Sequence, residues 1–107
     1  MEYTEEILKI AKFMGLAPIK GFNEHTGNEY YYYNNSEMQD YEGLPFYNTW
    51  EEIMPVVIKI ESLGGEKNEF DIFGNCVELG DEEFVGKTKL EAVIKAINWW
   101  LSKNYNK

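Results

Sequence analysis

The sequence predicts an α+β fold in which three helices pack on a small antiparallel β-sheet. Apolar residues recur at helical spacing in three segments, two of these segments open with a capping box, and another region alternates apolar and polar residues around tight turns. The 107 residues are close to the usual size of one domain. We therefore expect a single domain over residues 1–107, with its elements in the order α-β-α-β-β(-β)-α.

The first helix is expected to begin after Thr4 and to end at Gly15. The Thr4 hydroxyl is suited to capping the helix, and Glu5 and Glu6 follow where the helix dipole is positive. Apolar residues then recur at helical spacing along one face. Gly15 favours the left-handed conformation with which many helices end.

Residues 21–47 sustain neither the two-residue nor the 3.6-residue period, which predicts loops and short strands. Four consecutive tyrosines at positions 30–33 favour a strand, because aromatic side chains suit a pleated, half-buried surface. In a strand, half of these tyrosines face one side of the sheet and half face the other. Core packing therefore explains only part of the run.

Two capping boxes predict where the second and third helices begin, at Thr49–Glu52 and at Thr88–Glu91. The second helix should end at Gly64–Gly65, and the apolar stripe of the third continues to Leu101. Pro55 lies inside the second helix, where it lacks an amide hydrogen and crowds the preceding turn. We therefore predict a kink or a restart at Pro55.

A small antiparallel meander is expected between the second and third helices. Residues 69–73 and 76–79 alternate in polarity on either side of a Gly74–Asn75 turn, which is a hairpin signal. Residues 83–85 form a third candidate strand after Gly80–Asp81. The predicted sheet is made from the 69–85 segment, and the tyrosine run is a candidate for extending it.

Three segments carry a resemblance to known proteins: Ile10–Gly15, Tyr47–Glu61 and Lys87–Ile97. Together they resemble a family of uncharacterised phage and prophage proteins described as the phage ABA sandwich domain. The middle segment is the specific one, since a Trp just after a cap followed by Met-Pro-Val-Val is an unusual string. Members often carry a second Trp where this chain has Glu52. The resemblance implies helices layered around an antiparallel sheet and a gene on a bacterial virus or integrated element, with no known activity.

The composition excludes several classes of protein. Nineteen acidic residues against ten Lys and no Arg give a net charge of −9, which repels nucleic-acid backbones and anionic lipid. The single Cys excludes an intramolecular disulfide and a thiolate metal cluster. The N-terminal residues lack a signal-peptide pattern, and no apolar run reaches the length of about 18 residues that a membrane helix needs. We expect a cytoplasmic protein with neither nucleic acid nor membrane as a direct partner.

No catalytic motif emerges from the chemistry-bearing residues. The one His is His25, in a polar loop, and the one Cys is Cys76, in a predicted strand, so a nucleophilic triad has little basis. Acids near Asp81, together with Asp71 and Glu78, match no known cation loop, although a hard cation prefers such oxygen ligands. We expect no cofactor and no metal. A small metal-dependent enzyme using acids near Asp81 is kept as an alternative.

The distribution of charge points instead to protein binding. Residues 24–85 hold fifteen acids and two Lys, a charge of −13, whereas residues 86–107 carry +4. If the acids lie near one another, they form a surface suited to a basic partner, and tyrosines in the same stretch add rigid contact area. The predicted contact residues are Glu24, Glu29, Tyr31, Tyr33, Glu37, Asp40, Tyr41, Glu42, Asp81 and Glu82.

The leading hypothesis is a non-catalytic accessory protein of a phage or mobile element that binds a host or viral protein through an acidic, Tyr-rich face. One specific form is mimicry of the charge of DNA, by which the protein would occupy a nucleic-acid-binding enzyme. A further alternative is a structural or self-assembling virion component, held together through exposed Trp and Tyr. Trp50, Trp99 and Trp100 are interpreted mainly as packing anchors, with one partly exposed indole as a candidate contact for homo-oligomers.

Overall fold

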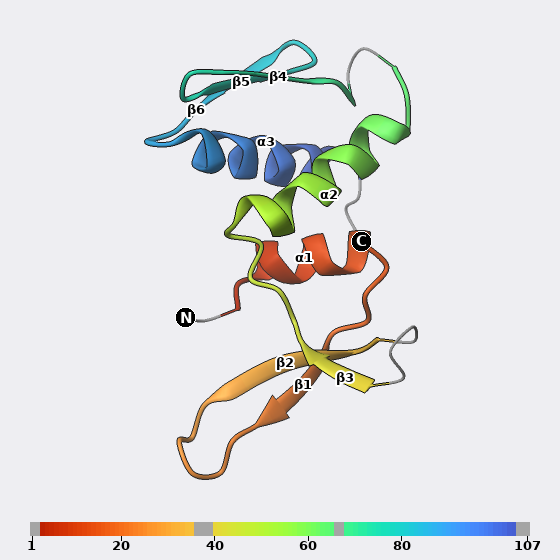
Figure 1. Ribbon diagram of the computed structural model, residues 1–107, viewed down its shortest axis with the longest axis vertical. Helices are drawn as coiled ribbons and strands as arrows, with labels where there is room; N and C mark the ends of the chain where they lie inside the picture. Colours follow the sequence, from red (N-terminus) through yellow and green to blue (C-terminus); the bar gives the residue numbers. More distant parts are fainter. Residues whose placement is uncertain (1–2, 36–39, 66–67, 105–107) are drawn as a thin grey trace. The chain divides into compact units, whose positions relative to one another are not determined.

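The computed structural model describes residues 3–35, 40–65 and 68–104. These residues form three helices and two three-stranded antiparallel sheets, which confirms the predicted α+β class. The chain divides into two compact units, unit 1 within residues 1–46 and unit 2 within residues 47–107. The elements of unit 1 are α1 (Glu5–Phe13), β1 (Ile19–Phe22), β2 (Glu29–Asn35) and β3 (Asp40–Gly43); those of unit 2 are α2 (Trp50–Ser62), β4 (Phe70–Phe73), β5 (Cys76–Leu79), β6 (Glu82–Val85) and α3 (Lys89–Asn104) (Figure 1).

Helix α1 has the ends that its sequence predicts. The Thr4 hydroxyl accepts a hydrogen bond from the Ile7 amide at 3.3 Å, and Gly15 follows the helix with a φ of +85°. This left-handed backbone conformation is one that glycine adopts without a steric penalty. The residues of α1 that become buried are Ile10, Ala11 and Phe13, which are among the apolar residues of the predicted face.

The sheet of unit 1 is built around the tyrosine run. Strand β2 pairs with β1 on one side and with β3 on the other, both antiparallel, so the order is β1-β2-β3. In the first pairing Ile19 lies opposite Tyr32, and in the second Tyr32 lies opposite Gly43. The predicted strand at the tyrosine run is confirmed, and it belongs to a sheet separate from that of residues 70–85.

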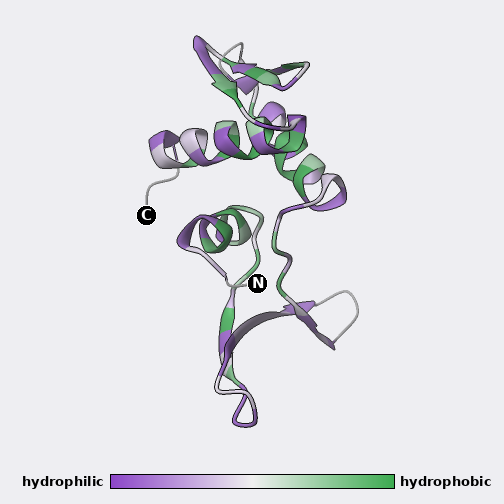
Figure 2. Ribbon diagram, turned by 90° about the vertical axis from the view of Figure 1, so that its left-hand side faces the viewer, coloured by the Kyte–Doolittle hydropathy of each residue, from purple (hydrophilic) through white to green (hydrophobic). Residues whose placement is uncertain are grey.

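Unit 2 is layered, with the sheet β4-β5-β6 on one side of α3 and α2 on the other (Figure 1). Its core combines residues that lie far apart in the sequence. In Figure 2, apolar and polar residues alternate along the ribbons of α2 and α3, as amphipathic helices require. The fully buried side chains come from α2, β5 and α3: Ile53, Val56, Val57, Ile60, Val77, Leu79, Ala92, Val93, Ala96, Ile97 and Leu101.

Helix α2 is capped as predicted but passes through Pro55 without a break. The Thr49 hydroxyl accepts from the Glu52 amide at 3.3 Å, and the Glu52 carboxylate accepts from the Asn48 amide at 3.2 Å. The prediction of a restart at Pro55 is wrong, since one helix spans Trp50–Ser62. Pro55 and Glu51 are both exposed, so the carbonyl that loses its helical donor lies where water is available.

The Gly74–Asn75 turn fixes the register of the second sheet. It places Phe73 opposite Cys76 and Asp71 opposite Glu78, and β6 continues the pattern with Glu83 opposite Glu78. Because side chains alternate along a strand, one face of this sheet presents apolar residues to α3 and the other faces away. The face toward α3 carries Phe70, Ile72, Val77, Leu79, Glu82 and Phe84; the outer face carries Asp71, Phe73, Cys76, Glu78, Glu83 and Val85.

The cap of α2 is directly testable. Replacing Thr49 with alanine removes the acceptor of the Glu52 amide and should lower the free energy of unfolding by about 1 kcal/mol. Urea denaturation followed by circular dichroism measures this change. Ser102 is a matched control, because its hydroxyl only donates to the Trp99 carbonyl in its own helix. Ser102→Ala should stay within about 0.5 kcal/mol of the wild type, and equal losses for both variants would refute the capping role.

Candidate functional site

The four consecutive tyrosines of β2 are divided between the two faces of the sheet in unit 1. Tyr31 and Tyr33 lie on one face, and Tyr30 and Tyr32 lie on the other, because side chains alternate along the strand. The neighbouring strands add different residues to each face. The surroundings of the two pairs therefore differ, and so do their roles.

Tyr31 is covered by the N-terminal part of unit 1. The Tyr3 ring meets the Tyr31 ring edge-on, with the centroids 5.4 Å apart, and stacks on Phe46 at 4.2 Å. The Tyr3 hydroxyl also donates a hydrogen bond to the Leu44 carbonyl, and the Leu44 amide donates to the Tyr31 carbonyl at 3.1 Å. This cluster joins residues 41 positions apart in the sequence, so Tyr31 serves the packing of unit 1.

Other residues on this face make polar contacts, while Phe22 of β1 is 60% exposed there. The Tyr33 hydroxyl donates to the Glu42 carboxylate at 2.8 Å, and this hydrogen bond raises the pKa of the Tyr33 phenol. Lys20 lies 3.0 Å from Glu29, which raises the pKa of the lysine through a hydrogen bond and the opposite charge. Both contacts are exposed, so they orient the side chains more than they stabilise the fold.

The opposite face carries a ladder of aromatic rings, of which the outer two are exposed and the central one is half-buried. Tyr30 and Tyr32 have ring centroids 5.8 Å apart, and Tyr32 meets Tyr41 of β3 edge-on at 5.6 Å. Tyr41 is 62% exposed, Tyr30 46% and Ile19 of β1 37%. The Tyr30 ring lies over Gly21, where a Cβ atom would overlap it. We call Ile19, Tyr30, Tyr32 and Tyr41 the tyrosine face.

The predicted contact residues do not form one demonstrated surface. Eight of the ten lie in unit 1 and two, Asp81 and Glu82, lie in unit 2. Tyr41 shares a face with Tyr30 and Tyr32 and is separated by the sheet from Tyr31 and Tyr33. Glu24 lies in the turn between β1 and β2. Glu37 lies outside the described residues, and Glu29, Asp40 and Glu42 are exposed in strands β2 and β3.

Sequence reasoning missed Tyr30 and Tyr32 as surface residues, although it included Tyr41. Alternation along β2 was foreseeable, but the choice between its two faces depends on Tyr3 covering Tyr31. The pairing of Tyr41 beside Tyr32 also depends on the register of β3, which no tight turn sets within the described residues. The only local signal was Gly21, which lies on the tyrosine face and leaves room for the Tyr30 ring.

Cys76 and His25 lie in different units and do not form a described catalytic pair. Burial and a hydrogen bond to Glu83, helped by the charges of Glu83 and Glu78, raise the pKa of the Cys76 thiol. A thiol with a raised pKa is a poor nucleophile near neutral pH. His25 lies in the β1–β2 turn, where its amide donates to the Asn23 side chain at 2.9 Å.

The acids that the metal-dependent alternative would use are divided between the two faces of the second sheet and its β5–β6 turn. Glu82 shares the face of Phe84, whereas Asp71, Glu78 and Glu83 share the outer face and Asp81 lies in the turn between β5 and β6. Within residues 3–35, 40–65 and 68–104, no three His, Cys, Asp or Glu side chains are grouped so that they could hold a metal ion. The metal-dependent alternative therefore gains no support from the described geometry.

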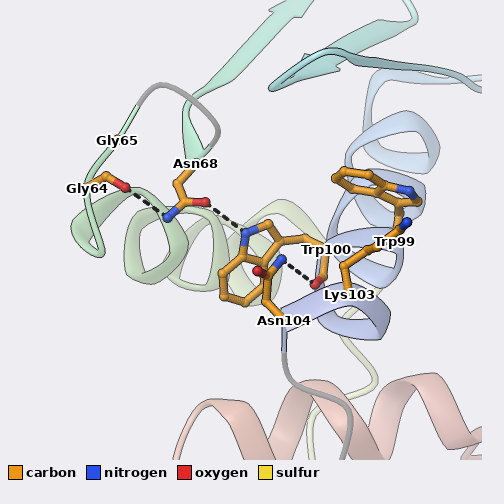
Figure 3. A pocket seen from close by; sticks show the side chains of 7 residues that line it. All are labelled: Gly64, Gly65, Asn68, Trp99, Trp100, Lys103 and Asn104. Atoms are coloured by element: carbon orange, nitrogen blue, oxygen red, sulfur yellow. Dashed lines mark hydrogen bonds between the residues drawn. The ribbon is translucent and has the colours of Figure 1, made fainter.

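A hollow of about 560 Å³ lies where the end of α2 meets α3 (Figure 3). The Trp100 indole, 5% exposed, donates to the Asn68 side-chain oxygen at 3.0 Å, and the Asn68 amide nitrogen donates to the Gly64 carbonyl at 2.9 Å. Trp99 points to another side of α3, 5.6 Å from Phe84 between ring centroids. The polar groups at the hollow thus hold α2 to α3, which favours a structural role.

The comparisons with known proteins assign no relationship. No family model, no curated protein and no solved structure matches the chain. The resemblance to the phage ABA sandwich domain stays a prediction that rests on its three sequence segments. Separately, none of the helices in the described part of the chain combines the length and the hydropathy needed to cross a membrane.

The hydrogen bond between Asn68 and the Trp100 indole can be tested by substitution. Asn68→Ala removes the acceptor of the buried Trp100 indole N–H and should lower the free energy of unfolding by about 1–3 kcal/mol. Asn68→Asp keeps an acceptor oxygen and should lose clearly less. Urea denaturation monitored by tryptophan fluorescence compares the two, and an unchanged stability of Asn68→Ala would contradict the role of this hydrogen bond.

The surroundings of Cys76 predict slow alkylation. Because its pKa is raised, the thiolate fraction at mildly alkaline pH should be lower than that of a free cysteine, and the pH midpoint of the reaction with iodoacetamide should be higher. Glu83→Gln removes a negative charge beside the thiol and should move the midpoint down. Glu82→Gln on the other face is the control, and identical midpoints for both variants would argue against the Glu83 contact.

Proposed function

We propose that this chain is a non-catalytic protein-binding module whose contact surface is the tyrosine face of unit 1. The partner is a host or viral protein with a basic surface. The observation that carries the proposal is the ladder of Tyr30, Tyr32 and Tyr41, in which Tyr30 and Tyr41 are exposed on either side of the half-buried Tyr32, while Tyr31 on the other face contacts Tyr3.

Exposed tyrosines of this kind suit protein recognition. A tyrosine ring brings a large contact area with few rotatable bonds, so little conformational entropy is lost on binding. The rings of the tyrosine face are already ordered by their mutual contacts at 5.6–5.8 Å, which lowers this loss further. Tyr32 is central in the ladder and half-buried, the position at which interface residues contribute most.

The charge around the tyrosine face favours a basic partner. Residues 19–43 contain five acids and one Lys, a charge of −4. Glu29 and Glu42, and the Lys20 that pairs with Glu29, lie on the opposite face with Tyr31 and Tyr33, so their charge reaches the tyrosine face as a field and not as a direct contact. Such charge steers a basic partner toward the aromatic contact and makes association sensitive to salt.

A more specific form of the proposal is an accessory protein of a phage or integrated element that occupies a nucleic-acid-binding enzyme by mimicking the charge of DNA. The net charge of −9 without any Arg supports this form, as does the sequence resemblance to phage proteins. It implies that the partner also binds nucleic acid and that the two compete. Competition with duplex DNA therefore separates charge mimicry from ordinary protein binding.

The proposal is tested by affinity purification followed by measurement with the purified partner. Tyr32→Ser and Tyr41→Ser should weaken binding about tenfold or more, because each removes an aromatic contact at the centre or edge of the ladder. Tyr33→Phe is the matched control, since it lies on the opposite face and keeps its ring while losing the hydroxyl. High salt should release the partner from the wild type.

The outcome that would overturn the proposal is a partner that binds all three variants equally. A partner lost only with Tyr33→Phe would place the contact on the opposite face and would equally reject it. Circular dichroism and urea denaturation confirm that the variants are folded, which is expected for Tyr41 because it is 62% exposed. Light scattering that showed self-association through Tyr41 would favour the self-assembling alternative instead.

A further inference from the structure

The outer face of the sheet in unit 2 combines two parallel rows of side chains. Asp71, Glu78 and Glu83 lie directly opposite one another on adjacent strands and form an acidic row. Phe73, Cys76 and Val85 are likewise opposite one another and form an apolar row beside it. Among the described residues of unit 2, no helix packs on this face, since α3 lies on the other side of the sheet (Figure 1). We call the six residues the outer face.

The acidic row is unfavourable for the isolated sheet. Directly opposed side chains on neighbouring strands have Cβ atoms about 4.5–5.5 Å apart, and like charges at such positions destabilise a sheet. Glu78 is opposed by an acid on both sides. The ion pairs Lys20–Glu29 and Glu91–Lys95 lie elsewhere and do not relieve it. A surface that keeps such a row is suited to a partner that neutralises it.

The apolar row is exposed where a free sheet would favour polar residues. Val85 is 61% exposed and Phe73 is 50% exposed, while Cys76 lies between them. Cys76 and Glu78 lie two residues apart on β5, so the two rows are adjacent on this face. Phe73 is the largest of the three and is the natural anchor for a partner, because aromatic residues dominate the energy of small interfaces.

We propose that the outer face binds a basic amphipathic helix of a partner protein, with a Lys/Arg stripe on the acidic row and an apolar stripe on the apolar row. This surface is separate from the tyrosine face, and the proposal does not depend on it. The acidic row requires a partner of positive charge, and the spacing of the rows favours a helix as its secondary structure.

The spacing fits a helix better than a strand. Adjacent strands are about 4.8 Å apart, so three carboxylates in a row span about 10 Å. Successive turns of an α-helix rise 5.4 Å, so three basic residues on one face span about 11 Å. Same-side residues of an extended chain are about 6.7 Å apart and would span about 13 Å. The helix lies across the strands, along the rows.

The distance between the rows agrees with the same arrangement. Residues two apart in a strand are separated by about 6.7 Å, and this is the distance between the acidic and the apolar row. On a helix about 10 Å in diameter, stripes one residue apart in sequence are separated by about 8 Å. A second copy of this chain is a poorer occupant, because it brings an acidic row of the same sign against the first.

The proposal is tested with a synthetic helical probe. The probe is an Ala-based peptide of about 18 residues, long enough to be helical, with a Lys stripe beside a Leu stripe. A control peptide of the same composition has the two stripes on opposite faces. Fluorescence anisotropy of the labelled peptides against the full chain should give at least tenfold tighter binding for the adjacent stripes, and high salt should abolish it.

Variants of the chain locate the binding. Glu78→Gln removes the central charge of the acidic row and should weaken binding of the probe about tenfold, and Phe73→Ser should do the same by removing the anchor. Glu51→Gln is the matched control, because it removes one exposed acid from α2 of the same unit. Glu78→Gln should also raise the urea midpoint of unfolding, since it relieves repulsion from both neighbours, so its loss of binding is not a loss of folding.

Three outcomes would overturn the proposal. Equal loss of binding for Glu78→Gln and Glu51→Gln would show attraction by net charge alone. Unchanged binding for Phe73→Ser would remove the apolar row from the contact. Concentration-dependent self-association that Phe73→Ser abolishes would make a second copy the occupant of the outer face. Chemical-shift changes at residues 71–73, 76–78 and 83–85 on addition of the probe, by contrast, would support it.

Discussion

The alternation of side chains along β-strands is the constraint on which both proposed surfaces depend. In unit 1 it separates Tyr30 and Tyr32 from Tyr31 and Tyr33, and in unit 2 it separates the apolar residues facing α3 from the outer face. A shift of β5 by one residue would turn Glu78 toward α3 and expose Val77 and Leu79, and a shift of β2 would exchange the two pairs of tyrosines. The register of the strands therefore decides which tyrosines and which acids lie together on one face.

Different interactions hold the two registers. In unit 2 the two-residue Gly74–Asn75 turn aligns β4 with β5, and the burial of Val77 and Leu79 against α3 keeps that alignment. In unit 1 no side chain of the three strands is fully buried, and the Tyr3 ring between Tyr31 and Phe46 selects the covered face. The exposed ladder is thus a consequence of packing on the opposite side of the same strand.

Local sequence signals predicted most of the fold. The caps at Thr4, Thr49 and Thr88 mark the helix starts, because a hydroxyl satisfies an amide that the first turn leaves unbonded. The Gly74–Asn75 turn predicted the hairpin of β4 and β5. The contacts that select the tyrosine face could not be predicted from the sequence. Tyr3 contacts Leu44 across 41 residues, and no local periodicity encodes such a contact. The restart at Pro55 failed because an exposed carbonyl is solvated at little cost.

The predicted contact residues rest on charge summed along the sequence, which does not show which residues share a face of a sheet. Charge summed over residues 24–85 describes a field, and at physiological salt a field extends about 8 Å from each charge before it is screened. Such a field steers a partner without requiring the acids to meet. Binding at contact distance depends instead on short rows such as Asp71, Glu78 and Glu83, which register creates. The two proposals therefore assign to the acids of the centre attraction as a group and contact through local rows.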